Sequence, residues 1–392
     1  MPFVVYMLGL AVFAQGTSEF MLSGLVPDIA RDMHVSIPAA GLLTSAFAAG
    51  MIVGAPLMAI LSLRRSRRRS LLTFLVVFLL VHVLGAVTTD FGVLVATRVV
   101  GALASAGFLA VALATATGTV APNAKGRATS VLLGGVTLAC VVGVPAGALL
   151  GQLWGWRSAF WAVALVSVPA VVAILRTVPA GDPGSSRTSV RGELGSLRDR
   201  RLLVILLLGA LVNGATFCTF TYLAPLVTTV TGIGSAWVPA VLALFGLGSF
   251  LGVTVGGRVA DTRPVPFLVT GGVALLAGWA VFAVTAGNPV AAIVLVFVQG
   301  TLAFAVGSVL ISQALYAATG APTLAGGFAT AAFNVGAAIG PWVGGLSIGA
   351  GLGYRSPLWV SASLVALALV TAGGARLLRR GTAEPHEDLA TA

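Results

Sequence analysis

Two residues of this sequence carry charge inside its long apolar runs. Glu19 is the only carboxylate deep within such a run, and Arg98 lies in the fourth run along the chain. A charge at the centre of a bilayer costs about 2.5–3.5 kcal/mol on insertion scales, so such residues usually face the interior of a bundle and have a function. Because burial favours the neutral form of a carboxyl group, Glu19 is predicted to exchange protons. Arg98, which stays protonated, is predicted to supply a fixed positive charge near the proton path.

The sequence leaves a structural role open for both residues. Glu19 could instead pair with a polar neighbour, and Arg98 could reach the membrane surface or make a structural hydrogen bond. The pattern does not decide whether the two side chains meet. His82, in the third apolar run, is predicted to be structural.

The elements that hold these residues are apolar runs of membrane-spanning length. The chain has 392 residues, 58% of them hydrophobic and 8% charged, whereas soluble domains are about 25% charged. A spanning helix needs about 20 mostly apolar residues, and the runs do not alternate in polarity as barrel strands do. The predicted fold class is therefore an all-α integral membrane protein. Its predicted spans are 3–27, 39–62, 70–87, 91–119, 128–150, 157–177, 202–223, 236–259, 265–285, 289–317, 325–349 and 357–378.

Composition argues against metal, cofactor and catalytic chemistry. The two cysteines, Cys140 and Cys218, lie in apolar runs and are predicted to be small buried hydrophobes. The chain has three histidines and neither an H-E-x-x-H pattern nor a nucleophile elbow. We therefore expect no metal, no cofactor and no enzymatic activity. The net charge of +11 arises from basic residues between the runs, so it reports topology and does not indicate nucleic acid.

Basic residues alternate strictly between the two sides of the predicted bundle. One side carries eighteen Lys and Arg residues, and the other carries only Arg31, Arg157 and Arg355. Basic loops stay in the cytoplasm. This predicts that both termini are cytoplasmic.

The two halves of the chain are related by an ungapped shift of 198 residues. The shift pairs Pro27 with Pro225 and Trp161 with Trp359, and it pairs the segments 155–158 and 353–356. Six spans per half give both halves the same orientation, which is a parallel duplication suited to alternating access. The predicted units are a bundle at 1–177, a cytoplasmic linker at 178–201, a bundle at 202–380 and a disordered tail at 381–392.

Further candidates for a central cavity follow from helix geometry and the repeat. Gln15 and Ser23 lie four residues from Glu19 on one helical face. The shift pairs Gln15 with Asn213 in the seventh span, so these two could face each other. Helix packing or lipid contact is the alternative for each candidate. The other candidates are Phe217, Tyr222, Phe328, Phe333 and Asn334.

Several motifs resemble the major facilitator superfamily over nearly the whole chain. The loop after span eight, with Gly257, Arg258, Asp261 and Arg263, looks like the signature loop of that family, which implies a conformational gate. The equivalent first-half loop lacks the Gly and Asp and keeps only a basic cluster with Arg64 and Arg65. Arg98 stands in a segment similar to the family motif with a membrane-buried arginine.

Other motifs are similar to the twelve-span drug/proton antiporters within that superfamily. Spans five and eleven hold small residues and prolines typical of the antiporter motif: Gly143, Pro145, Gly147, Gly151, Gly340 and Pro341. The segments 17–20, 24–30 and 155–157 resemble the chloramphenicol-resistance exporters of high-GC bacteria.

This resemblance implies a major facilitator fold of two six-helix bundles and a monomer in the cell membrane. It implies that the proton gradient drives efflux of a small amphiphilic drug, with chloramphenicol as the first candidate substrate. The alternatives are an exporter of a sugar or other metabolite and a broader multidrug exporter. A channel and a membrane enzyme are disfavoured by the two-fold repeat and by the lack of catalytic motifs.

Overall fold

The fold is a bundle of membrane-spanning helices, as the apolar runs predict. The computed structural model describes residues 1–62, 66–121, 124–178, 199–260, 263–318 and 325–381. Within these ranges there is no strand, and twelve helices are long and apolar enough to cross a membrane. The predicted all-α membrane fold is confirmed, and the predicted spans match those helices to within a few residues at most ends. The predicted linker and tail fall mostly outside the described residues, so their boundaries stay predictions.

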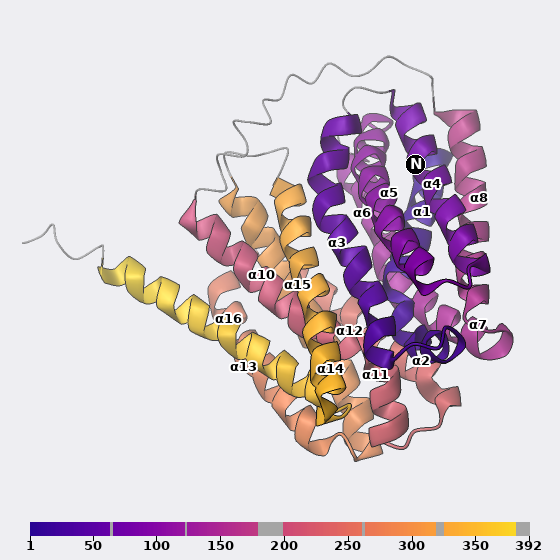
Figure 1. The fold of residues 1–392 in the computed structure, drawn as a ribbon. Helices are drawn as coiled ribbons and strands as arrows, with labels where there is room; N and C mark the ends of the chain where they lie inside the picture. The colour runs from indigo at the N-terminus through magenta and orange to yellow at the C-terminus, as the bar shows by residue number, and fades with distance from the viewer. Residues whose placement is uncertain (63–65, 122–123, 179–198, 261–262, 319–324, 382–392) are drawn as a thin grey trace, which may run out of the picture.

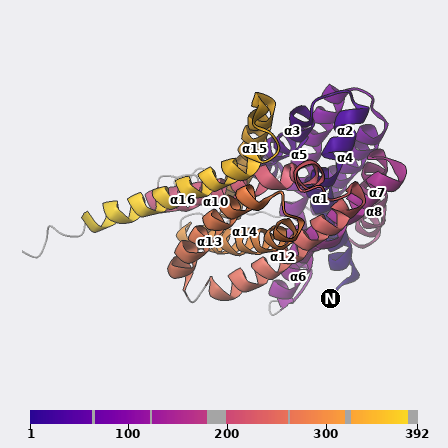
Figure 2. The same cartoon turned by 90° about the horizontal axis from the view of Figure 1, so that it is seen from below.

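The first half contains spans one to six, and the second half contains spans seven to twelve. Figure 2 shows the first-half helices gathered on one side and the second-half helices on the other. Several spans are divided by a break or a π-helical turn. The first-half elements are α1 (Phe3–Phe20), α2 (Leu22–Asp32), α3 (Ile37–Ser62), α4 (Arg67–Val87), α5 (Phe91–Gly118), α6 (Lys125–Leu138), η2 (Ala139–Gly143), α7 (Val144–Trp154) and α8 (Arg157–Thr177). The second-half elements are α10 (Arg200–Thr221), α11 (Leu223–Pro225), η4 (Leu226–Val230), η5 (Ser235–Trp237), α12 (Val238–Val259), α13 (Pro264–Thr285), α14 (Pro289–Ala317), α15 (Ala325–Ser347), η6 (Ile348–Leu352) and α16 (Ser356–Gly381).

Packing within the two halves follows the same plan, as the internal repeat predicts. In the first half α1 packs on α6, α3 on α5 and α4 on α8; in the second, α10 packs on α15, α12 on α14 and α13 on α16. The helix starts are equivalent too. Asp90 caps α5 and Asn288, 198 residues later, caps α14 with side-chain acceptors. The repeat in the sequence is therefore a repeat in three dimensions.

The halves meet along two helix pairs that the repeat makes equivalent. One pair is α3 with α15, which lie side by side in the centre of Figure 1, and the other is span five with α12. Glycine lets the backbones approach. A Cβ atom on Gly246 of α12 would lie 2.3 Å from the carbonyl oxygen of Cys140. Inside the second half, Gly340 packs as closely on Gly214 of α10.

Prolines follow the breaks in the spans. Pro27, Pro145 and Pro225 each lack the backbone N–H that would bond the carbonyl four residues earlier. Span one breaks at Met21, span seven breaks at Tyr222, and the π-helical η2 ends two residues before Pro145. Glu19 lies two residues before the first break.

The Gly246 contact yields a test of the packing between the halves. Gly246→Val should destabilise the protein by about 1–3 kcal/mol, because the side chain has no room against the backbone of span five. A lower thermal unfolding midpoint in detergent would show this. Gly373→Ala is the matched control, because a Cβ atom there meets no other atom within 4 Å. Equal midpoints for the two variants would contradict the close packing.

Candidate proton and substrate site

Arg98 is buried in the first half and is held by one residue of α1. Its guanidinium donates from Nη1 to Ser18 Oγ at 2.7 Å and from Nη2 to the Ser18 carbonyl oxygen at 2.8 Å. The charge also lies over the Phe47 ring, with Cζ 4.4 Å from the centroid. Arg98 is 1% exposed and Ser18 is fully buried. Arg98 thus has a fixed position inside the bundle and does not reach the membrane surface.

His82 joins the same cluster, which its sequence context did not indicate. Its Nε2 atom lies 2.6 Å from Ser18 Oγ, and its Nδ1 atom lies 2.7 Å from the Phe78 carbonyl oxygen. The ring packs between Phe78 and Phe160, at centroid distances of 4.1 and 5.8 Å. The sequence signal for this contact is that His82, like Arg98, is a polar residue inside an apolar run.

Glu19 follows Ser18 but faces a different environment. Its side chain keeps partial exposure, and within the described part of the chain it forms no hydrogen bond or ion pair. Arg98 is nevertheless nearby, because both of its hydrogen bonds end on Ser18, the residue next to Glu19. The structure thus brings the two predicted residues into the same region without a direct salt bridge. A carboxyl group that is accessible and unpaired is free to gain and lose a proton.

Two further polar candidates from α1 and α2 lie inside the first half. Ser105 donates to Gln15 Oε1 at 3.3 Å, while Gln15 Nε2 is buried without a partner. Ser23 bonds back to the Phe20 carbonyl oxygen and is 2% exposed. Ser23 therefore stabilises the broken helix, whereas Gln15 keeps an unused donor.

Among the cavity candidates of the second half, some bond between or within helices and some are partly exposed. Asn213 donates to the Phe333 carbonyl oxygen at 2.7 Å, and Asn334 donates to its own helix at Thr330. Asn213, Phe333 and Phe328 are partly exposed, and Asn334 is 7% exposed. Gln15 and Asn213 make no hydrogen bond to each other in the described residues.

A row of aromatic rings in contact runs from Phe20, the residue after Glu19, into the second half. Phe20 lies 5.6 Å from Phe217, which contacts Phe220, and Phe220 stacks on Phe245 at 4.5 Å. Phe245 in turn contacts Phe304. This aromatic row crosses from α1 to α10, α12 and α14. Its first ring belongs to Phe20, the residue that follows Glu19 in the chain.

Tyr222 occupies the interface between the halves and does not line an open cavity. It is 1% exposed, and its hydroxyl donates to the Pro341 carbonyl oxygen at 2.9 Å. A Cβ atom on Gly41 of α3 would lie 2.2 Å from that hydroxyl oxygen, and one on Gly345 would lie 2.6 Å away. Tyr222 therefore closes the contact between α3 and α15 at the end opposite the linker.

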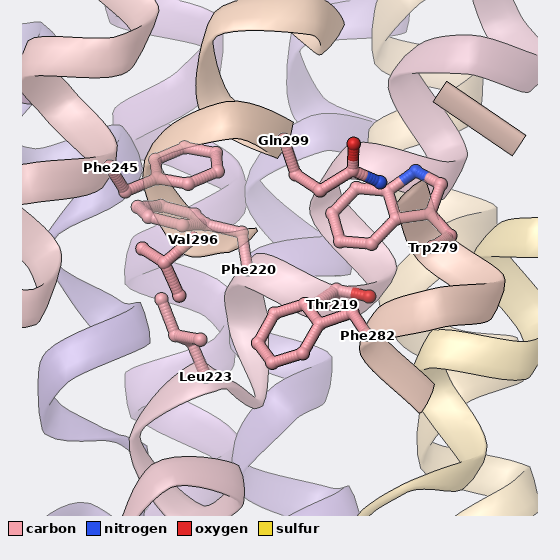
Figure 3. Close-up of a pocket in the computed structure, with 8 residues that line it drawn as sticks. All are labelled: Thr219, Phe220, Leu223, Phe245, Trp279, Phe282, Val296 and Gln299. Atoms are coloured by element: carbon pink, nitrogen blue, oxygen red, sulfur yellow. The ribbon is translucent and has the colours of Figure 1, made fainter. Parts of the chain in front are cut away.

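A small cavity lies inside the second half, next to the aromatic row. Figure 3 shows Gln299 and Trp279 close together, with Phe220 and Phe245 stacked beside them. Gln299 Oε1 and Trp279 Nε1 are buried without partners. The cavity measures about 10 Å³, which is room for about one water molecule. In this conformation it cannot take a drug.

The antiporter-motif residues pack span five against span one. A Cβ atom on Gly143 would lie 2.0 Å from Thr17 Oγ1, and one on Gly151 would lie 2.4 Å from Leu25. Gly147 faces Met21 at the break. These glycines therefore set the position of the segment that carries Glu19.

The gate candidates lie at the linker end of the bundle. Gly257, Arg258 and Arg263 are exposed there. The remaining gate candidates lie outside the described residues: Asp261, Arg64 and Arg65. The proposed pairing within this loop therefore stays a prediction. Among the described residues, no group of three or more His, Cys, Asp or Glu side chains could hold a metal.

An ion-pair cluster fixes the opposite end of the first half. Asp32 accepts hydrogen bonds from Arg157 and, at 3.0 Å, from Trp156 Nε1. Arg157 also donates to the Thr88 carbonyl oxygen and lies over the Trp156 ring. Trp156 is 3% exposed, and it bonds α2 and packs on Phe160 of α8, while Arg157 bonds the end of α4. The Arg157 bond, followed by the Trp156 bond, holds the pKa of Asp32 below its ordinary value of 3.8.

This cluster makes stability depend on pH in an acidic window. A depressed pKa in the folded state stabilises the fold above pH 3.8 and loses that contribution as the pH falls through the lower folded value. Asp32→Asn should therefore lower the thermal midpoint at neutral pH and make little difference in strong acid. Asp28→Asn, which breaks only the exposed pair with Arg31, is the control. A deficit of Asp32→Asn that stays constant across the titration would contradict the assignment.

Comparison with known proteins agrees with this architecture. The sequence model of the protein family described as the Major Facilitator Superfamily matches residues 8–326 of this chain. A chloramphenicol resistance protein of Streptomyces lividans is 55% identical over 375 residues, which cover 95% of this chain and 96% of the relative. The inner membrane transport protein YdhP of Escherichia coli K12 is 36% identical over 364 residues, which cover 93% of each chain.

A solved structure shares the fold at low sequence identity. A bacterial homolog to the human lysosomal transporter Spinster, in an inward-facing and unoccupied conformation, superposes with a TM-score of 0.76 at 17% identity, and the match covers 94% of this chain and 95% of that one. Together with the twelve spans and the two-fold packing, these matches place this chain, a multi-pass membrane protein, in the Major Facilitator Superfamily.

Proposed function

We propose that this protein exports a small amphiphilic drug, with chloramphenicol as the first substrate to test, in exchange for protons. It would thereby confer antibiotic resistance. The 55% identity to a protein named for chloramphenicol resistance supports the substrate. The observation that carries the coupling is the unpaired, partly exposed carboxyl group of Glu19. Its chain neighbour Ser18 holds a buried arginine, and its other neighbour Phe20 begins an aromatic row.

The surroundings of Glu19 suit an amphiphilic aromatic ligand. Phe20 of the first half contacts Phe217 of the second half, and one turn before Glu19 the Gln15 side chain has a buried amide donor without a partner. A sugar would need many hydroxyl and amide contacts, because each unpaired polar group costs free energy on burial. The aromatic row favours drug export over sugar export.

The proposed cycle couples drug and proton through opposed binding. A drug that enters beside Glu19 favours loss of its proton, because the drug and the proton make opposed demands on one site. The halves then rock, the drug leaves, and Glu19 takes a proton from outside. The glycine contacts of α3 with α15 and of span five with α12 would act as the rocking surfaces. The proton gradient is the energy source, and the cycle needs no cofactor and no enzymatic chemistry.

Growth of a drug-sensitive host in chloramphenicol tests the coupling. The wild type should protect, and Glu19→Gln should protect no better than the empty vector, because a neutral amide cannot carry the proton. Asp28→Asn is the matched control, since it removes a carboxylate of the same span that forms only a local pair with Arg31. Membrane expression must be equal for all variants. A Glu19→Gln variant that protects fully would contradict the coupling role of Glu19. A well-expressed wild type that gives no protection would contradict chloramphenicol as the substrate and would favour a metabolite or a broader set of drugs.

Both termini are proposed to lie in the cytoplasm of the cell membrane, with the protein acting as a monomer. The support is the distribution of eighteen basic residues on the linker side against three on the other. A fluorescent protein fused after residue 392 should fluoresce, and an alkaline phosphatase fused there should be inactive. The reverse result would overturn the orientation.

A further inference from the structure

Hydrogen-bond chemistry fixes the direction of each link from Arg98 to His82. The Phe78 carbonyl oxygen can only accept, so His82 Nδ1 carries the proton. In the neutral ring Nε2 then accepts, and the hydroxyl of Ser18 is its donor. Arg98 can only donate, so Ser18 Oγ accepts from it. A protonated ring would put a second buried positive charge beside Arg98, which electrostatic repulsion opposes.

In the second half, the position equivalent to Ser18 lacks the partners that His82 and Arg98 provide in the first half. The shift of 198 residues pairs Ser18 with Thr216, whose hydroxyl donates to the Val212 carbonyl oxygen in its own helix at 2.9 Å. The counterparts of His82 and Arg98 have apolar side chains: Ala280 and Val296. In the described structure the Ser18 hydroxyl makes no such bond within its helix. Removing the acceptor on His82 should therefore let the Ser18 hydroxyl turn back to its own helix.

We infer that His82 is a positioning residue, which keeps the Ser18 hydroxyl turned toward Arg98 and so sets the guanidinium's place relative to Glu19. The inference rests on the proposed role of Glu19 as proton carrier. Both side-chain hydrogen bonds of Arg98 end on Ser18, the residue bonded directly to Glu19. Water cannot replace His82 easily, because its ring is 3% exposed between Phe78 and Phe160.

Loss of His82 should change the charge balance at Glu19. With the hydroxyl turned away, Nη1 of Arg98 loses its acceptor, and the unpaired carboxylate of Glu19 is the charged acceptor available to it. A direct pair would stabilise the ionised carboxylate. The other titratable groups that face Glu19 and Arg98 are His82 from α4 and the Cys140 thiol from span five. From the second half, the uncharged Phe217 packs beside Phe20.

Infrared difference spectroscopy on the purified full-length protein measures this directly and needs no substrate. The C=O stretch of the protonated carboxyl group that disappears in Glu19→Gln is followed as a function of pH. We expect its midpoint to move to lower pH by about one unit or more in His82→Phe, which keeps an aromatic ring but cannot accept. Ser18→Ala should move it similarly, and His82→Gln, which has both an acceptor and a donor, should keep the wild-type midpoint.

Thr216→Ala is the matched control, because it removes the equivalent hydroxyl from the second half. It should leave the midpoint unchanged. A wild-type midpoint in both His82→Phe and Ser18→Ala would overturn the inference, as would equal shifts in His82→Phe and His82→Gln. If His82→Phe does not fold, Ser18→Ala compared with Thr216→Ala decides the question. Failure of the wild type to transport chloramphenicol would contradict the proposed substrate and leave this titration valid.

Discussion

A positive charge buried inside the helix bundle is the constraint on which the first half depends. Removing a charged group from water costs several kcal/mol unless hydrogen bonds replace the lost hydration. Arg98 obtains two of these bonds from Ser18 and a further contact from the Phe47 ring. α1 must therefore stay at a fixed rotation beside α5. That rotation carries Ser18 inward and leaves the next residue, Glu19, partly exposed.

The repeat gives both halves one frame and lets their chemistry differ. Val296 stands where Arg98 stands, and Gln299 occupies the position of Gly101 one turn further on. The second half therefore has a buried amide and indole around a small neutral cavity instead of a charged cluster. Asp32 likewise has no acidic counterpart, because Val230 stands 198 residues later. The duplicated fold thus carries a buried charge in one half and a neutral polar pair at the matching place in the other.

The sequence predicted spans well and side-chain partners poorly, for a physical reason. Spans are set by length and apolarity over about 20 residues, so neighbours in the sequence determine them. The contact of His82 with Ser18 joins residues 64 positions apart in the sequence. It depends on how two helices are rotated about their axes. A helix that is apolar on every face has no sequence pattern that predicts this rotation. Tyr222 was expected at a cavity and lies in an interface because Gly41 lets α3 approach it. Trp156, which resembles an aromatic anchor at a span end, is buried by its bond to Asp32.

The location of the charged cluster bears on how a proton site can work in a rocking transporter. Arg98, Ser18 and His82 all belong to the first half, whereas the proposed rocking surfaces are glycine contacts between the halves. A rigid rotation of the halves would leave the hydrogen bonds of the cluster intact. What would change is the surface of the second half that packs against Phe20, the residue next to Glu19, since Phe217 belongs to that half. In the proposed cycle the proton affinity of Glu19 would then follow solvent access and the bound drug, with the arginine as a constant reference charge.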